Sequence, residues 1–216
     1  MLALYGHPFS SYTWKALIPL YANGTPFEFR ALGPDQPNNG AFVQTAHPAG
    51  KFPVLSDGQT TVIEATAIVE YLAVHHPGPA PLLPADPAEA ATARMLDRVF
   101  DNYVMANLQR VVSAHIADMA RPDQAEVAGG KEGLQRAYRW LEGWLAGHEL
   151  PAHVSLVTCA AAPSLFYADW VEPIPDDCGR LAALRAELMA LPAVVRCVDD
   201  ARPFRPLFPL GAPDRD

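Results

Sequence analysis

The pattern of apolar and polar residues predicts a strand and then a helix at the start of the chain. Residues 2–5 are an apolar run ended by a Gly-His-Pro segment, as expected of a buried strand. Apolar residues then recur at helical spacing over residues 14–21, and the Asn-Gly pair that follows is typical of a helix C-terminus. Pro19 removes one backbone hydrogen bond from this helix, so a kink is expected there.

The next segment alternates in the manner of a sheet. In residues 26–32, Phe27 and Phe29 alternate with the charged residues Glu28 and Arg30, which predicts a strand with one covered face. Residues 33–40 are rich in Pro, Asn and Asp, which predicts a loop. Residues 52–55 and 60–63 flank an Asp-Gly pair, a strong signal for a hairpin. Apolar residues on one helical face predict a helix over 64–76, and a proline ends it.

This order of elements predicts two domains. One crossover makes two strands parallel and the hairpin adds antiparallel pairing, so residues 1–77 are predicted to form a mixed four-stranded α/β domain. Residues 78–87 are rich in proline and are interpreted as the interdomain linker. Residues 88–216 are predicted to form an all-helical domain.

Helical spacing continues through most of the second half of the chain. Helices are predicted over residues 86–119, 131–147, 155–171, 181–191 and 193–201. The third of these is apolar on nearly all sides, so we expect it to be buried at the centre of its domain. The proline-rich tail at 202–216 is expected to lie extended over the surface.

Composition and charge exclude several classes of protein. The chain has 216 residues and a net charge of −8, and it lacks the clustered Lys and Arg that a nucleic-acid partner requires. No apolar stretch is long enough to span a membrane, and the N-terminus does not resemble a signal peptide. The three cysteines are far apart and form no disulfide framework. A cytoplasmic protein with reduced thiols is therefore expected.

Several local motifs, beginning with residues 4–15 (LYGHPFSSYTWK), resemble the cytosolic glutathione transferases, in particular bacterial members with an active-site serine. The order of elements extends this resemblance over the whole chain. It implies an α/β thioredoxin-like N-terminal domain followed by an all-α helical domain. It also implies glutathione as co-substrate, no metal, a homodimer, and a role in detoxification.

The first motif implies a catalytic hydroxyl at Ser10. In the family, a hydroxyl at the start of the first helix donates to the glutathione sulfur. A free thiol is mostly protonated at neutral pH, and a hydroxyl donor at a helix N-terminus favours the thiolate. Ser10 is equally a normal helix N-cap residue. Ser11 and Tyr5 remain alternatives for the catalytic hydroxyl.

Two further motifs imply the glutathione contacts. In residues 47–55 (HPAGKFPVL), the resemblance implies a cis peptide bond at Pro53, backbone pairing of the cysteinyl unit with Phe52, and a glycine carboxylate facing Lys51. At the start of the helix over 64–76, Glu64 is implied to hold the γ-glutamyl amino group. The family typically has Ser after it, but this chain has Ala65, which leaves carboxylate binding to backbone N–H groups, with Thr66 as a further donor.

The helical half adds two weaker expectations. Ser155 matches the start of a capping box that the family completes with Asp, where this chain has Thr158. In the helix over 86–119, Tyr103, Asn107 and Arg110 are spaced along one face and are candidates for the second-substrate pocket. Residues of this kind are also commonly core or dimer interface.

The sequence therefore predicts an enzyme in which glutathione thiolate attacks a small, largely apolar electrophile. Two alternatives stay open. One is a glutathione-transferase-like binding or assembly protein with little catalysis, which Ala65 favours. The other is a glutathione-dependent isomerase, whose motifs also resemble the Ser10-Ser11 and Trp14 segment.

Overall fold

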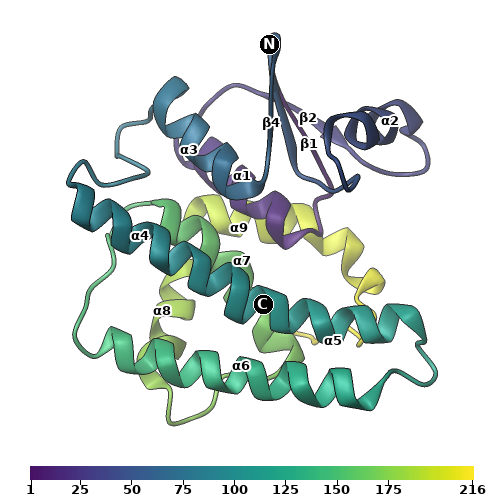
Figure 1. Ribbon diagram of the computed structural model, residues 1–216, viewed down its shortest axis with the longest axis vertical. Helices are drawn as coiled ribbons and strands as arrows, with labels where there is room; N and C mark the ends of the chain where they lie inside the picture. Colours follow the sequence, from purple (N-terminus) through teal and green to yellow (C-terminus); the bar gives the residue numbers. More distant parts are fainter.

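The computed structural model describes residues 1–216. Its N-terminal part is a four-stranded sheet flanked by three helices (Figure 1). The elements are β1 (Leu2–Gly6), α1 (Ser11–Ala22), β2 (Glu28–Ala31), α2 (Pro37–Ala46), β3 (Val54–Asp57), β4 (Thr60–Ile63) and α3 (Ala65–His75). The strand order is β2-β1-β3-β4, with β1 parallel to β2 and the other two pairs antiparallel. The predicted mixed four-stranded sheet is therefore confirmed.

Helix α1 begins and ends where local chemistry requires it. The Ser10 side chain caps its N-terminus by accepting a hydrogen bond from the Thr13 N–H at 3.3 Å. Gly24 follows the helix with φ of 60°, a left-handed conformation that glycine adopts without steric cost. The helix continues through Pro19, whose carbonyl accepts from the N–H of Asn23 at 3.0 Å.

Helix α2 corrects the loop predicted over residues 33–40. Pro37 stands at the start of this helix, where its missing N–H costs nothing. Tertiary contacts then hold the helix in place: Asn39 donates to the Ala31 carbonyl at 2.8 Å, and Val43 is buried. These contacts outweigh the loop preference of a segment that contains two Asn and a Gly, and they are not visible in the local sequence.

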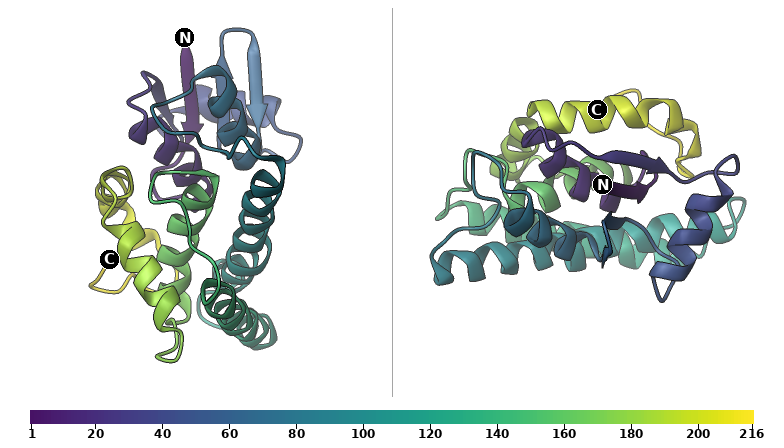
Figure 2. Two further views of the ribbon diagram at one scale, coloured as in Figure 1. Left: turned by 90° about the vertical axis from the view of Figure 1, so that its left-hand side faces the viewer. Right: turned by 90° about the horizontal axis from the view of Figure 1, so that it is seen from above.

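The C-terminal part is a layered set of helices. The elements are α4 (Pro87–Val99), η1 (Phe100–Met105), α5 (Ala106–Ala117), α6 (Gln124–Leu145), α7 (Leu156–Val171), α8 (Gly179–Met189), α9 (Pro192–Ala201) and η2 (Arg202–Leu207). Figure 2 shows α4 to α6 on one side of this domain and α8 and α9 on the other, with α7 between them. Every residue of α7 is buried, which confirms its predicted central position.

The long helix predicted over 86–119 contains an irregularity that periodicity did not indicate. Asp86 caps its start as expected, but residues 100–105 form a π-helical turn, η1, between α4 and α5. A π-helical turn adds a residue to the turn, so every residue beyond it faces a direction that α-helical spacing does not predict. Helix α6 also begins earlier than predicted, because Asp123 caps it at residue 124.

The start of α7 keeps its capping box despite the change from Asp to Thr. The Thr158 N–H donates to Ser155 Oγ at 3.5 Å, and the Ser155 N–H donates to Thr158 Oγ1 at 3.2 Å. Both halves of the motif are present, so Thr158 replaces the carboxylate as the acceptor.

The tail is more ordered than the extended segment predicted for it. Residues 202–207 form a 3₁₀ turn, and Phe208 is buried with its ring 5.3 Å from that of Trp170. Arg215 contacts the Asp169 carboxylate and donates to the Asp169 carbonyl at 2.9 Å. Aromatic packing and ion pairing therefore hold the tail against α7, and both depend on residues far away in the sequence.

Candidate active site

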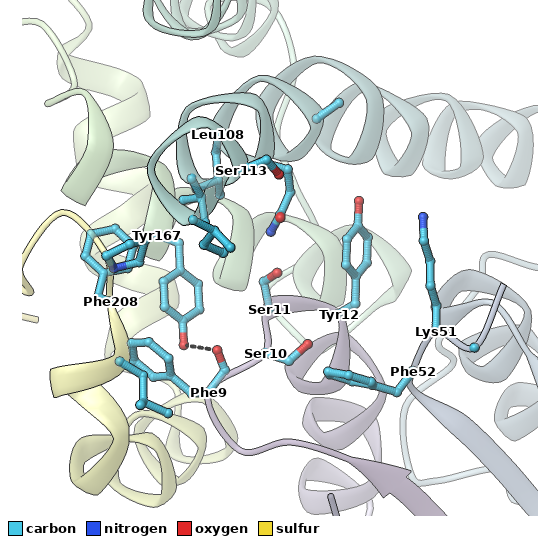
Figure 3. A pocket seen from close by; sticks show the side chains of 17 residues that line it. Phe9, Ser10, Ser11, Tyr12, Lys51, Phe52, Leu108, Ser113, Tyr167 and Phe208 are labelled. Atoms are coloured by element: carbon cyan, nitrogen blue, oxygen red, sulfur yellow. Dashed lines mark hydrogen bonds between the residues drawn. The ribbon is translucent and has the colours of Figure 1, made fainter. Parts of the chain in front are cut away.

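A cleft of about 680 Å³ lies where the first turn of α1 and the loop before β3 face α5, α7 and the tail (Figure 3). Its lining comes from both halves of the chain. The residues that line it are Phe9, Ser10, Ser11, Tyr12, Gly50, Lys51, Phe52, Ala106, Leu108, Gln109, Val112, Ser113, Ile116, Tyr167, Leu207, Phe208 and Pro209. Ser10, Lys51 and Phe52 were predicted from the motifs, and the structure brings these three together in one cavity.

Ser10 has a hydroxyl proton that is free to be donated. Its oxygen accepts from the Thr13 N–H, which leaves its own O–H without a partner in the chain. The loop that carries it is held on both sides: Trp14 Nε1 donates to the Pro8 carbonyl at 2.6 Å, and the Tyr167 hydroxyl donates to the Phe9 carbonyl at 3.1 Å. A cap residue at a helix N-terminus is thus also a positioned donor inside the cleft.

The two alternative hydroxyls are placed differently. Ser11 is buried, and its hydroxyl donates to the sulfur of Met105 at 3.3 Å. Tyr5 does not line the cleft, because successive residues of a strand point to opposite faces of a sheet and its ring is turned to α2. The ring stacks on Phe42 at 4.2 Å between centroids. Ser10 is therefore the one hydroxyl of the three that both lines the cleft and has an uncommitted proton.

Lys51 supplies positive charge at one end of the cleft. It follows Gly50, which has φ of 60°, and its ammonium makes no ion pair within the chain. Phe52 lies beside it, and the peptide bond between Phe52 and Pro53 is cis, as predicted. Figure 3 shows the Lys51 and Tyr12 side chains extending in the same direction from neighbouring walls. An unpaired ammonium at the mouth of a cavity is suited to bind a carboxylate.

Glu64, predicted to hold the γ-glutamyl amino group, does not line the cleft. It is the one non-glycine residue with positive φ, at 68°, and it immediately precedes α3. Such conformations persist where the surrounding structure enforces them and cluster at functional sites. His47 Nδ1 accepts from the Ala49 N–H at 3.0 Å, so its proton lies on Nε2, 3.4 Å from Glu64 Oε1. The sequence analysis did not predict this contact between His47 and Glu64.

Ala65 is buried at the first position of α3 and offers no side-chain donor. The structure also changes the expectation for Thr66. Its hydroxyl donates to Asp97 Oδ2 at 3.0 Å and accepts from Lys15 Nζ at 2.9 Å, so it is committed within the protein. Any carboxylate bound at this helix N-terminus would therefore depend on backbone N–H groups.

The other end of the cleft is apolar and aromatic. Leu108 and Val112 of α5 line the cleft together with Tyr167 of α7 and Phe208 of the tail. Tyr12 adds a hydroxyl near the middle, and burial raises its pKa to about 12, so it stays a neutral phenol at physiological pH. The sequence motifs gave no signal for this wall, because its residues come from three distant segments.

Tyr103, Asn107 and Arg110, which were predicted as second-substrate residues, do not line this cleft. Tyr103 and Asn107 line a separate groove between α5 and α6, and Arg110 pairs with Glu126 of α6. Asn107 lies against Gly133 and Arg110 against Gly129, so this face of the helix is turned to α6. The face of α5 that does line the cleft includes Gln109 and Ser113.

A buried cluster of charges is centred on Lys15, and the sequence analysis did not predict it. Lys15 of α1 is 1% exposed, and its ammonium lies 2.6 Å from Asp97 Oδ1 and 2.7 Å from Asp101 Oδ2. Arg98 contacts both carboxylates from the solvent side and also reaches Thr66. Burial raises the pKa of Asp101, and Lys15 opposes that rise. The cluster joins α1, α3, α4 and η1, so it fixes the sheet domain against the helical domain.

Groups of metal ligands, reactive thiols and membrane-spanning helices would each indicate another kind of site. No group of three or more His, Cys, Asp or Glu is arranged to hold a metal ion. All three cysteines are buried, and burial raises the pKa of each thiol, so none is a reactive thiolate. None of the helices has both the length and the apolar character that a membrane crossing needs.

Comparisons with known proteins agree with this architecture. A solved glutathione S-transferase from Methylobacterium radiotolerans, in complex with glutathione sulfonate, superposes with a TM-score of 0.76 at 25% identity, covering 91% of this chain and 94% of that one. The thioredoxin-like domain followed by helices is thus the glutathione transferase fold. Residues 4–80 match the family of the glutathione S-transferase N-terminal domain. The chain is a member of the glutathione S-transferase superfamily.

Individual relatives are distant and differ in kind. FtsZ-localized protein A of Caulobacter vibrioides is 33% identical over 144 residues, which is 60% of this chain and 61% of that protein. A probable maleylacetoacetate isomerase of Vibrio cholerae is 28% identical over 94% of this chain and 97% of its own length. The chain thus aligns with about three fifths of the first relative and nearly all of the second.

Proposed function

We propose that this protein is a glutathione transferase that joins glutathione thiolate to small apolar electrophiles. The observation that carries the proposal is the Ser10 hydroxyl, which faces the cleft at the N-terminus of α1 with its proton uncommitted. Lys51 at one end suits the glycine carboxylate of glutathione, and the apolar wall at the other suits an electrophile. The protein would supply thiolate stabilisation and proximity, while the nucleophile is the ligand.

The first experiment is titration of the purified protein with glutathione, followed by calorimetry and by thiolate absorbance. Ser10→Ala should abolish the thiolate signal near neutral pH and lower kcat/KM by about 10- to 150-fold, since a hydrogen bond to a charged group contributes about 1.5–3 kcal/mol. Ser11→Ala is the matched control and should keep the signal. Ser10→Gly removes the hydroxyl while costing the helix cap only a few tenths of a kcal/mol.

Thiolate absorbance that persists in both Ser10 variants would assign the hydroxyl to another residue. Absence of glutathione binding in the wild type would instead support the second candidate, a binding or assembly protein of this fold. That candidate is favoured by Ala65, which removes a side-chain donor from the γ-glutamyl site, and by the similarity to FtsZ-localized protein A. A glutathione-dependent isomerase is the third candidate, and product analysis separates it from a transferase.

We also propose that the protein is a homodimer that pairs through the face formed by η1, α5 and α6. Tyr103 and Trp140 are 58% and 47% exposed there and line a groove of about 590 Å³ with Val99 and Arg136. Exposed aromatic residues around a groove are typical of an interaction surface. Sedimentation velocity should give a dimer for the wild type and a monomer for Trp140→Glu. A wild-type monomer would refute this pairing.

A further inference from the structure

The loop between β1 and α1 carries Ser10 into the cleft, and side chains hold its backbone at both edges. The carbonyl of Pro8 accepts a hydrogen bond from Trp14 Nε1 at 2.6 Å. The N–H of the same peptide unit belongs to Phe9, and it donates to His7 Nδ1 at 3.1 Å. This peptide unit therefore cannot rotate without losing a hydrogen bond at each edge.

The next peptide unit, between Phe9 and Ser10, is held in the same way. Its carbonyl accepts from the Tyr167 hydroxyl at 3.1 Å, the bond drawn as a dashed line in Figure 3. Its N–H donates to the His7 carbonyl at 3.0 Å. His7 thus provides two of the four contacts, one through its ring and one through its backbone. The ring contact is the one that a substitution of His7 can remove.

The His7 ring is itself fixed by the tail. It meets Phe204 of η2 edge-on, with 4.7 Å between the ring centroids and an angle of 69° between the ring planes. The His7 N–H donates to Thr13 Oγ1 at 3.3 Å, which ties its backbone to α1. Burial lowers the pKa of His7, so the imidazole is neutral at physiological pH and Nδ1 keeps the lone pair that accepts from Phe9. The ring is therefore a fixed acceptor, held between the tail and the loop.

Ser10 needs this support because its hydroxyl has two tasks. Its oxygen accepts from the Thr13 N–H at 3.3 Å as the cap of α1, while its proton must point to the glutathione sulfur. The cap fixes the oxygen relative to the helix, and the four contacts of the loop fix the backbone that carries it. Without the His7 ring, the Phe9 N–H would lack an acceptor, and the loop would rearrange to find one.

We propose that His7 is a positioning residue for the transferase reaction: its ring accepts the Phe9 N–H and so holds the Ser10 hydroxyl at the glutathione sulfur. This inference rests on the proposed function, because it concerns the hydroxyl that stabilises the thiolate. His7 does not line the cleft, so it acts through Ser10 rather than on a substrate. A displacement of about 1 Å can cost about a hundredfold in rate, which makes the geometry of this loop important.

Two substitutions separate the acceptor from the ring. His7→Asn places an amide oxygen at the position of Nδ1 but removes the ring that meets Phe204, and Asn side chains readily accept from the N–H two residues further on. His7→Phe keeps an aromatic ring against Phe204 but has no acceptor. If the hydrogen bond positions Ser10, the Asn variant should behave like the wild type and the Phe variant should not. If only packing matters, the order is reversed.

The readout is the thiolate absorbance of bound glutathione, titrated against pH. His7→Phe should move the midpoint upward by about one pH unit, which corresponds to about tenfold weaker stabilisation of the thiolate. His7→Asn should titrate like the wild type. Glutathione affinity at acidic pH, where the thiol is protonated, should be equal in all three proteins, because Lys51 and Phe52 are unchanged. A merely structural role of His7 would lower this affinity and the Tm without moving the midpoint.

The same substitution in a second background tests whether His7 acts through Ser10. In Ser10→Ala, the further change His7→Phe should leave the midpoint where it is, because the hydroxyl that His7 positions is gone. His7→Gln, whose amide does not reach the Nδ1 position, should resemble His7→Phe and replaces it if the Phe variant does not fold.

The outcomes separate this inference from the proposed function. A midpoint that is unchanged in His7→Phe and His7→Gln, that moves equally in His7→Asn, or that still moves in the Ser10→Ala background would overturn the role of His7. In each of those cases the wild type still forms the thiolate. Absence of thiolate in the wild type would instead overturn the proposed function, and the role of His7 in it, so the two failures are distinguishable.

Discussion

Replacement of Lys15 by methionine would remove a cation that is buried between the sheet and the helices. Its ammonium contacts Asp97 and Asp101 at 2.6 and 2.7 Å, and the side chain is 1% exposed. Removing one partner of a buried ion pair costs about 3–5 kcal/mol, because the remaining charge is left unpaired. Arg98 still contacts both carboxylates, so we expect a loss near the lower limit, about 3 kcal/mol. For a chain of this size, that lowers Tm by about 6–12 °C.

The loss should depend on pH with a definite sign. Burial already raises the pKa of Asp101, and removal of Lys15 takes away the group that opposes the rise. The native variant then keeps a proton that the unfolded chain releases above about pH 4. Stability therefore falls as pH rises from about 4 through the raised pKa of the native carboxyl and is level above it. The deficit of the variant should be smaller at pH 5 than at pH 8.

Chemical denaturation followed by tryptophan fluorescence at these two pH values measures both effects. Lys15→Met combined with Asp101→Asn should recover part of the loss, since the second change removes the unpaired carboxylate. Lys131→Met is the matched control, because Lys131 pairs with Glu172 at 3.4 Å while 41% exposed, and such a pair contributes about 0–1 kcal/mol. A loss below about 1 kcal/mol at pH 8, or no recovery in the double variant, would refute the reasoning.

Three further outcomes are expected. Gly130→Ala should lower the free energy of unfolding by about 1–3 kcal/mol in urea denaturation, because its Cβ would lie 2.8 Å from the backbone oxygen of Asn107. The matched control is Gly143→Ala, whose Cβ would meet nothing within 4 Å, and it should stabilise α6 by up to about 1 kcal/mol. A penalty for both changes would contradict the packing. Lys51→Met should weaken glutathione binding about tenfold by calorimetry but leave binding of the glycine ethyl ester of glutathione unchanged. Thr158→Val should cost about 1 kcal/mol in thermal unfolding, because the Ser155 N–H loses its acceptor in the capping box; an unchanged Tm would show that this hydrogen bond contributes little.

The sequence alone determined the features that depend on near neighbours. Strand β1 follows from a short apolar run, the hairpin of β3 and β4 from the Asp-Gly pair, and the starts of α1, α4 and α7 from capping residues. All of these signals act within a few residues. Ser10, Lys51 and Phe52 were found because each lies in a short motif that resembles the glutathione transferases. The structure places these three in one cavity.

Only the tertiary structure decided the features that depend on distant partners. Helix α2 forms because Asn39 reaches Ala31, against the local preference of its sequence. The spacing of Tyr103, Asn107 and Arg110 along one helix face was visible in the sequence, but only the packing of α6 decides that this face lies away from the cleft. The apolar wall of the cleft and the ion pairs of Lys15 bring together side chains that lie far apart in the sequence. Burial rather than local propensity selects such contacts.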